Sequence, residues 1–191
     1  GDTLDEADEV FLLNLSSPVA CSLAVTQVAG TIIDDDLAQR PTISVASASK
    51  TEGNSGSSNM AFTVSLDRAS GRSVVVGYQT LSGSAGSADF TSISGSLTFT
   101  AGQTSKTLNV PILGDTLDED DETFTLQLLS PLNALAGNLT ATGTIIDDDS
   151  SALSVSNRSV TEGNSGNVPA IFTVSLSVAS SIVSAVRCIA A

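Results

Sequence analysis

Residues 95–128 read GSLTFTAGQTSKTLNVPILGDTLDEDDETFTLQL, and this stretch decides the fold class. Apolar side chains occupy alternate positions in Leu97–Phe99, Leu108–Ile112 and Phe124–Leu128. An alternation with a period of two is typical of β-strands that bury one face. The acidic segment Asp115–Glu122 lies between two of these strands, so its carboxylates are expected to stand in a loop.

The same strand pattern continues on both sides of this stretch. Met60–Leu66 and Val74–Tyr78 alternate in the same way, and Thr42–Val45 and Leu139–Ile146 add two further apolar runs. Clusters of Gly, Ser, Asn and Asp separate the runs, and no segment has helical periodicity. Hydrophobic residues make up 41% of the chain and aromatic residues 4%, which indicates a core of Val, Ile, Leu and a few Phe. We therefore expect an all-β protein with an immunoglobulin-like antiparallel sandwich of about seven strands.

Four motifs recur along the chain. GDTLDE at residues 1–6 and GTIIDDD at residues 30–36 both recur 113 residues later, at 114–119 and 143–149. TEGNSG at residues 51–56 and FTVSL at residues 62–66 both recur 110 residues later, at 161–166 and 172–176. Self-similarity at a fixed period indicates tandem repeats, here of about 110 residues each.

The motif positions predict the domain organisation. Residues 1–36 are expected to be the C-terminal part of one repeat, residues 41–149 a complete repeat, and residues 152–191 the N-terminal part of a third repeat. The third copy departs from the pattern after about residue 180. We expect the first and last copies to be truncated and the chain to be an excerpt of a longer protein. A sandwich that lacks most of its strands cannot bury a full core, so the third part is expected to be poorly ordered or dependent on the second.

Charge limits the classes of partner. The net charge is −14, and 20 of the 21 acidic residues lie in a few short segments. This charge disfavours nucleic acid and anionic lipid surfaces, so neither is expected as a partner. No apolar run is long enough to span a bilayer, so no direct membrane insertion of this fragment is expected. A cation is the favoured partner.

The acidic segments predict a site for a hard metal ion. The loop Asp115–Glu122 and the run Asp147–Asp149 both lie at strand boundaries. If they meet at one end of the sandwich, each pair of carboxylates repels by about 1 to 4 kcal/mol, and a multivalent cation would relieve this. Oxygen ligands without His select hard ions, and calcium fits an irregular, loop-built site better than magnesium. The alternative is that the acids are merely solvated, but their recurrence at a fixed phase favours a site.

The order of the motifs resembles a Calx-beta repeat. TEGNSG, then Ser87-Ala88-Asp89-Phe90, then the stretch quoted above and finally GTIIDDD follow one another in the order of that family. The family includes calcium-binding regulatory domains of sodium–calcium exchangers and repeats of matrix, adhesion and bacterial surface proteins. The resemblance implies these metal ligands, with a backbone carbonyl at the leucine: Glu52, Asp89, Asp115, Leu117, Glu119, Glu122, Asp147, Asp148 and Asp149.

The resemblance also implies differences between the copies. Gly114 stands where some calcium-binding members carry a further Asp, which implies one ligand fewer. The third copy retains only Glu162. The first copy retains several acids of the pattern, namely Asp2, Glu6, Glu9, Asp34, Asp35 and Asp36.

The leading functional hypothesis is a calcium-binding structural or adhesive repeat of a larger extracellular or cell-surface protein. Its cofactor is Ca²⁺, and its partners are neighbouring repeats of the same chain and other cell-surface proteins. The alternative is a calcium-sensing regulatory domain of a membrane transporter or cell-communication protein, with a cytoplasmic location. We do not expect an enzyme. A glycosidase needs two acids placed across a substrate groove, whereas these acids are clustered and aromatic sugar platforms are absent.

Overall fold

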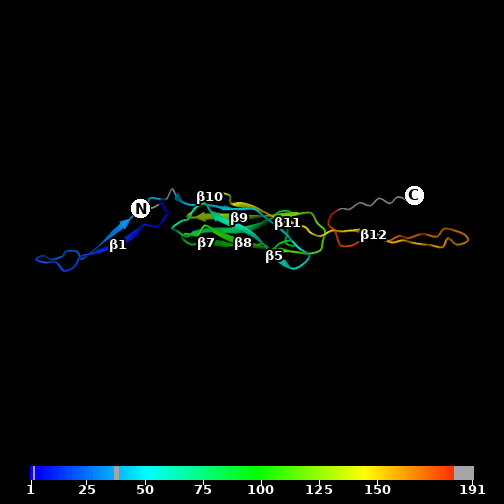
Figure 1. The fold of residues 1–191 in the computed structure, drawn as a ribbon, viewed down its shortest axis with the longest axis horizontal. Coiled ribbons are helices and arrows are strands. Elements are labelled where there is room, and N and C mark those ends of the chain that lie inside the picture. Colours follow the sequence, from blue (N-terminus) through cyan, green and yellow to red (C-terminus); the bar gives the residue numbers. More distant parts are fainter. Residues whose placement is uncertain (2, 37–38, 183–191) are drawn as a thin grey trace.

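The computed structural model describes residue 1, residues 3–36 and residues 39–182. The described residues form thirteen β-strands and no α-helix, so the chain is all-β as predicted. Figure 1 shows an elongated arrangement in which a central β-sandwich is flanked by a hairpin on each side. Within the described part of the chain, no helix is long and apolar enough to cross a membrane.

The central sandwich consists of two facing sheets. One has four strands in the order β10-β3-β5-β8, and the other has five in the order β4-β11-β9-β6-β7. The strand bounds are β3 (Thr42–Val45), β4 (Ala48–Thr51), β5 (Ser57–Leu66), β6 (Val74–Ser82), β7 (Ser94–Phe99), β8 (Ser105–Leu113), β9 (Glu122–Leu132), β10 (Leu135–Ala136) and β11 (Thr140–Ile146).

The expected count of seven antiparallel strands is wrong at two sheet edges. The sandwich has nine strands, because β4 and β10 were not predicted. Both pair in parallel, β4 with β11 and β10 with β3. The chain leaves one sheet after Val45 and enters the edge of the other sheet at Ala48. Strand β4 lies at this edge with no fully buried residue, so its sequence ASKT carries no apolar alternation.

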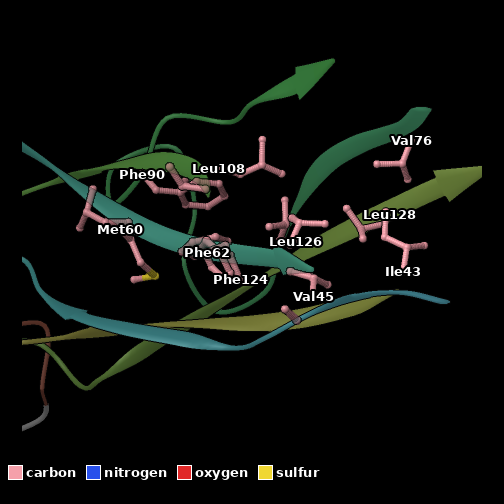
Figure 2. Packing of buried hydrophobic residues seen from close by; sticks show 14 of the residues in the cluster. Ile43, Val45, Met60, Phe62, Val76, Phe90, Leu108, Phe124, Leu126 and Leu128 are labelled. Carbon is pink, nitrogen blue, oxygen red and sulfur yellow. The ribbon is translucent and has the colours of Figure 1, made fainter. Parts of the chain in front are cut away.

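The core between the sheets is built around three phenylalanines. Phe62 on β5 meets Phe124 on β9 edge to face, with ring centroids 5.8 Å apart, and Phe90 stacks on Phe124 at 4.4 Å. All three are at most 2% exposed, and Figure 2 shows them grouped with Met60 and the aliphatic core. Burying each such ring stabilises the fold by about 2 to 3 kcal/mol. Because Phe90 is fixed in this core, it also fixes the neighbouring Asp89.

The flanking hairpins reproduce pairs of the central sandwich. The first pairs β1 (Glu9–Asn14) with β2 (Gln27–Ile32), and the second pairs β12 (Leu153–Val155) with β13 (Val174–Leu176). Glu9 opposes Ile32 as Glu122 opposes Ile145, and Leu153 opposes Leu176 as Ile43 opposes Leu66. The strand pairings in the two hairpins are therefore those of the central sandwich, shifted by the motif offsets of 113 and 110 residues.

The flanking hairpins lack a facing sheet among the described residues. Phe11 is 56% exposed, whereas its counterpart Phe124 is 1% exposed. The predicted departure from the repeat pattern after about residue 180 falls mainly on residues 183–191, which lie outside the described residues.

Candidate metal centre

The strand directions bring the acidic segments to one end of the five-stranded sheet. Strands β4 and β11 run parallel with Thr51 opposite Ile146, so the residues that follow them, Glu52 and Asp147, leave the sheet side by side. The Glu52 amide donates to the Ile146 carbonyl at 3.1 Å. Strand β9 runs in the opposite direction and begins at Glu122 beside Ile145, so the loop that precedes it arrives at the same end. The topology alone therefore gathers these carboxylates.

Seven of the predicted ligand residues form three overlapping carboxylate groups. In each group the ligand atoms lie within 4.8 Å of one another. Glu52 belongs to two groups and Glu119 to two, so these two residues connect the cluster. The groups are Glu52 with Asp115 and Glu119, Glu52 with Asp147 and Asp149, and Asp89 with Glu119 and Glu122.

Several carboxylate oxygens at the centre of the cluster lack a protein partner. Glu52 is only 7% exposed, and its Oε1 is buried without a hydrogen bond. Oδ1 of Asp147 and Oδ2 of Asp149 are buried in the same unpaired state. An unpaired buried carboxylate oxygen costs free energy, and each like-charge pair at this spacing adds about 1 to 3 kcal/mol. The donor set is all oxygen and its electrostatics are unfavourable without a cation, so these residues fit a hard metal ion such as calcium.

Backbone amides hold other carboxylate oxygens in place. Asp89 Oδ2 accepts from the Gly86 amide at 2.6 Å, and Asp115 Oδ1 accepts from the Leu117 amide at 2.7 Å. Such local bonds fix each side chain while its second oxygen keeps free lone pairs. The carboxylates are thus positioned before any ion arrives.

The turn after Glu52 contributes to the same framework. Gly53 has φ of 78° and Gly56 has φ of 74°, a region that glycine enters without strain. The Gly53 amide donates to Asp148 Oδ1 at 3.1 Å, and the Asn54 side chain donates to Asp149 Oδ1 at 2.5 Å. The TEGNSG motif therefore ties the Glu52 turn to the Asp147–Asp149 run.

The pKa values of three glutamates reflect burial first and the crowding of charge second. Burial, and after it the charges of Asp115, Asp147, Glu119 and Asp148, together raise the pKa of Glu52 to about 7. Burial, together with a hydrogen bond and the charge of Asp89, raises the pKa of Glu122 to about 7. The pKa of Glu119 is also raised, first by burial and then by Asp89, Asp115 and Asp147, against a lowering contribution from Ser181. Protons therefore compete for the positions that a cation would take.

A family model described as the Calx-beta domain matches residues 38–149. The chain belongs to the Calx-beta family. This confirms the resemblance that the motifs indicate, and the match covers the whole central sandwich. Among curated protein sequences, none matches the chain.

Two crystal structures share the Calx-beta fold with this chain. CBD12 from CALX1.2 is 22% identical over 56% of this chain and 46% of that chain, with a TM-score of 0.51. The calcium binding domain CBD12 of CALX1.1 is 26% identical over 64% of this chain and 53% of that chain, with a TM-score of 0.50. The chain thus spans about half the length of each of these solved structures.

The remaining predicted ligands of this Calx-beta domain lie beside the three groups. Asp148 contributes no oxygen to them and instead accepts from Gly53. For Leu117, the structure shows the amide bonded to Asp115, and the carbonyl stays a predicted ligand. Sequence reasoning gave no role to Asp121, whose Oδ1 accepts from the Asp147 amide at 3.2 Å, nor to Asn54. Asp121 is one of five consecutive acids, so no sequence signal distinguishes it, whereas Asn54 belongs to the recurrent motif TEGNSG.

Gly114, where the resemblance implies one ligand fewer, packs closely against the turn after Glu52. A Cβ at Gly114 would lie 1.9 Å from the Gly53 carbonyl oxygen and 2.8 Å from that of Glu52. The Gly114 amide donates to the Gly56 carbonyl at 3.0 Å. The two loops pack backbone against backbone here, which leaves no space for an aspartate.

A second acidic hollow lies in the segment before the Calx-beta match. A cavity of about 240 Å³ is lined by residues that correspond to the central cluster and include Glu6, Glu9 and Asp34–Asp36. Asp2, the remaining acid predicted for this copy, lies outside the described residues.

Proposed function

We propose that the chain is a calcium-binding structural or adhesive module of a larger extracellular or cell-surface protein. The observation that carries the proposal is the buried, unpaired Oε1 of Glu52 at the centre of two carboxylate groups. The proposed ligands are the nine residues predicted from the motifs. Bound calcium would neutralise the carboxylates and tie the β4, β9 and β11 ends together. The role is binding rather than catalysis.

A tandem arrangement is part of the same proposal. The flanking hairpins pair in registers that match those of the central sandwich at the motif offsets. This supports residues 1–36 and 152–191 as parts of neighbouring repeats around the complete repeat at 41–149. Because the acidic loop and the Asp147–Asp149 run adjoin the connection to the next segment, bound calcium would stiffen that connection.

Calcium is expected to raise the melting temperature of the full chain by several degrees. An ion that binds only the folded state adds about 2.7 kcal/mol at a hundredfold excess over Kd. Thermal melts in millimolar calcium, in chelator and in magnesium measure the effect, and titration calorimetry gives the affinity. Identical melts in calcium and in chelator would refute the proposed site.

Stability and affinity are expected to depend on pH in opposite directions. A carboxyl whose pKa rises from 4.5 to about 7 on folding favours the folded state at low pH, and this contribution disappears as the pH rises through about 7. The calcium-free protein should therefore melt higher at pH 5.5 than at pH 8. Calcium must displace these protons, so its affinity should fall by about tenfold or more between pH 8 and pH 6. An affinity independent of pH would exclude Glu52 and Glu122 as ligands.

A second candidate is a calcium-sensing regulatory domain of a membrane transporter or cell-communication protein. The likeness to CBD12 of CALX1.1 favours it, because that structure is named a calcium binding domain and is 26% identical to this chain. A sensor would change the angle between its segments on binding, whereas a structural repeat would only become stiffer. Small-angle scattering of the full chain with calcium and with chelator separates the two.

A further inference from the structure

One aspartate of the acidic loop faces the next segment of the chain instead of the metal centre. Asp118 Oδ2 accepts from the Ser151 amide at 3.1 Å and from the Ser151 hydroxyl. The Asp118 amide donates to the Ala179 carbonyl at 3.1 Å, and the Asp118 carbonyl accepts from the Ser181 amide at 3.0 Å. The Ser151 hydroxyl is the main cause of a lowered pKa at Asp118. This residue thus bonds both to the connecting segment and to the turn at Ala179–Ser181.

The corresponding aspartate of the first segment shares one of these backbone hydrogen bonds. Asp5 stands 113 positions before Asp118, and its carbonyl accepts from the Gly71 amide at 3.1 Å. Gly71 stands 110 positions before Ser181, so the two bonds are equivalent in the repeat. The same backbone hydrogen bond therefore occurs twice, once on each side of the central sandwich.

The two contacts differ in their side-chain chemistry. Asp5 is 1% exposed, and its carboxylate has Arg72 Nε at 3.6 Å from Oδ1 and Arg40 Nε at 3.9 Å from Oδ2. Arg72 Nε also donates to the Glu6 carbonyl at 2.7 Å. Around Asp118 the side-chain partner is Ser151, and Ile182 stands at the position equivalent to Arg72. Asp5 is buried and has ion pairs but no hydrogen bond to its carboxylate oxygens, whereas Asp118 is only partly buried and its carboxylate accepts hydrogen bonds.

We propose that this loop aspartate is a docking residue that fastens each repeat to the turn following the β5-equivalent strand of the next repeat. The docking surfaces are Ala69–Arg72 for Asp5 and Ala179–Ile182 for Asp118. The inference rests on the proposed tandem arrangement but requires no ion.

Neither aspartate is placed to bind the metal. Asp118 contributes to none of the carboxylate groups among the described residues, although its neighbour Glu119 contributes to two. Asp5 faces two guanidinium groups, whose positive charge opposes a cation at the same carboxylate. Asp118 therefore serves the docking contact alone, whereas its neighbour Glu119 belongs to the carboxylate groups and also bonds to Ser181.

Hydrogen exchange of single amides tests the docking in the full chain. In chelator, Asp118→Ala is expected to speed exchange of the Ser151 and Ser181 amides by about tenfold or more, because these amides become exposed when the contact opens. Core amides such as that of Leu126 should keep their rates. Asp120→Ala is the matched control, because Asp120 is an exposed acid of the same loop.

Calcium affinity distinguishes docking from ligation. Asp118→Ala should leave the affinity within about threefold of the parent chain. Unchanged exchange at Ser151 and Ser181 would overturn the proposal, and so would a tenfold loss of affinity without faster exchange. Because the exchange is measured in chelator, a chain that binds no calcium would still test the docking.

A variant at the first contact gives an independent readout. Arg72→Met removes one ion-pair partner of Asp5 and is expected to speed exchange of the Gly71 amide while the Ser181 amide keeps its rate. Asp118→Ala should give the reverse pattern. If either variant changed both amides equally, the contacts would not be separate docking points, and the proposal would fail.

Discussion

Replacing Glu52 with glutamine is expected to weaken calcium binding by about 100-fold or more and to stabilise the calcium-free protein. Glu52 belongs to two carboxylate groups, and its buried Oε1 has no protein partner. The amide keeps the shape of the side chain but removes its charge, so the cation loses a central ligand, worth about 2.7 kcal/mol at this fold-change. Without calcium, the same change removes repulsion from Asp115 and Asp147. Calorimetry and thermal melts in chelator measure the two effects.

Asp120→Asn is the matched control for this prediction. It removes one negative charge from the same loop at an exposed position that belongs to none of the described groups. Its effect on affinity should stay within about threefold, because the exposed charge is screened by solvent and salt. If both variants weakened binding equally, general electrostatics and not ligation by Glu52 would explain the loss.

The strands with an apolar alternation were predictable, and the two edge strands were not. Met60, Phe62 and Val64 alternate because β5 lies with one face on the core. Strand β4 has no such face, and β10 has only two residues, so neither leaves a hydrophobic pattern. Both exist because a neighbouring strand offers free backbone groups at a sheet edge, which is a property of the tertiary structure.

The convergence of the acids was predictable in part. Recurrence of the acidic runs and their position at strand ends led to the same segments that the topology gathers. The different contacts of the residues within Asp118–Glu122 were not predictable. Five consecutive acidic residues do not indicate which way each side chain points. Only the path of the loop determines that Asp118 faces Ser151 while Glu119 faces the cluster.

The role of Gly114 was also invisible in the sequence. The sequence indicates only that a ligand is absent at position 114. Nothing in the motif GDTLDE shows that the backbone of Gly53 occupies the space that a side chain at position 114 would need. The close packing of the two loops therefore requires a residue without a Cβ at position 114. We therefore expect that an aspartate at position 114 would weaken calcium binding and would not restore a ligand.

Gly114→Ala is expected to destabilise the protein by about 3 kcal/mol and to abolish most of its calcium affinity. The added Cβ would lie 1.9 Å from the Gly53 carbonyl oxygen, and backbone atoms on both sides must move to relieve the clash. That movement carries Glu52 away from Asp115 and Glu119. Denaturant unfolding in chelator and calcium titration measure the two losses.

Gly114→Asp and Gly86→Ala complete this experiment. Gly114→Asp should behave like Gly114→Ala, because the Cβ of the aspartate makes the same clash and the new carboxylate cannot relieve it. Gly86→Ala is the matched control, since its Cβ would meet only Asp89 Oδ2, at an ordinary 3.8 Å. It should change stability by less than about 1 kcal/mol. Tighter calcium binding in Gly114→Asp would show that the two loops can separate and that the close packing of Gly114 on Gly53 does not determine the ligand set.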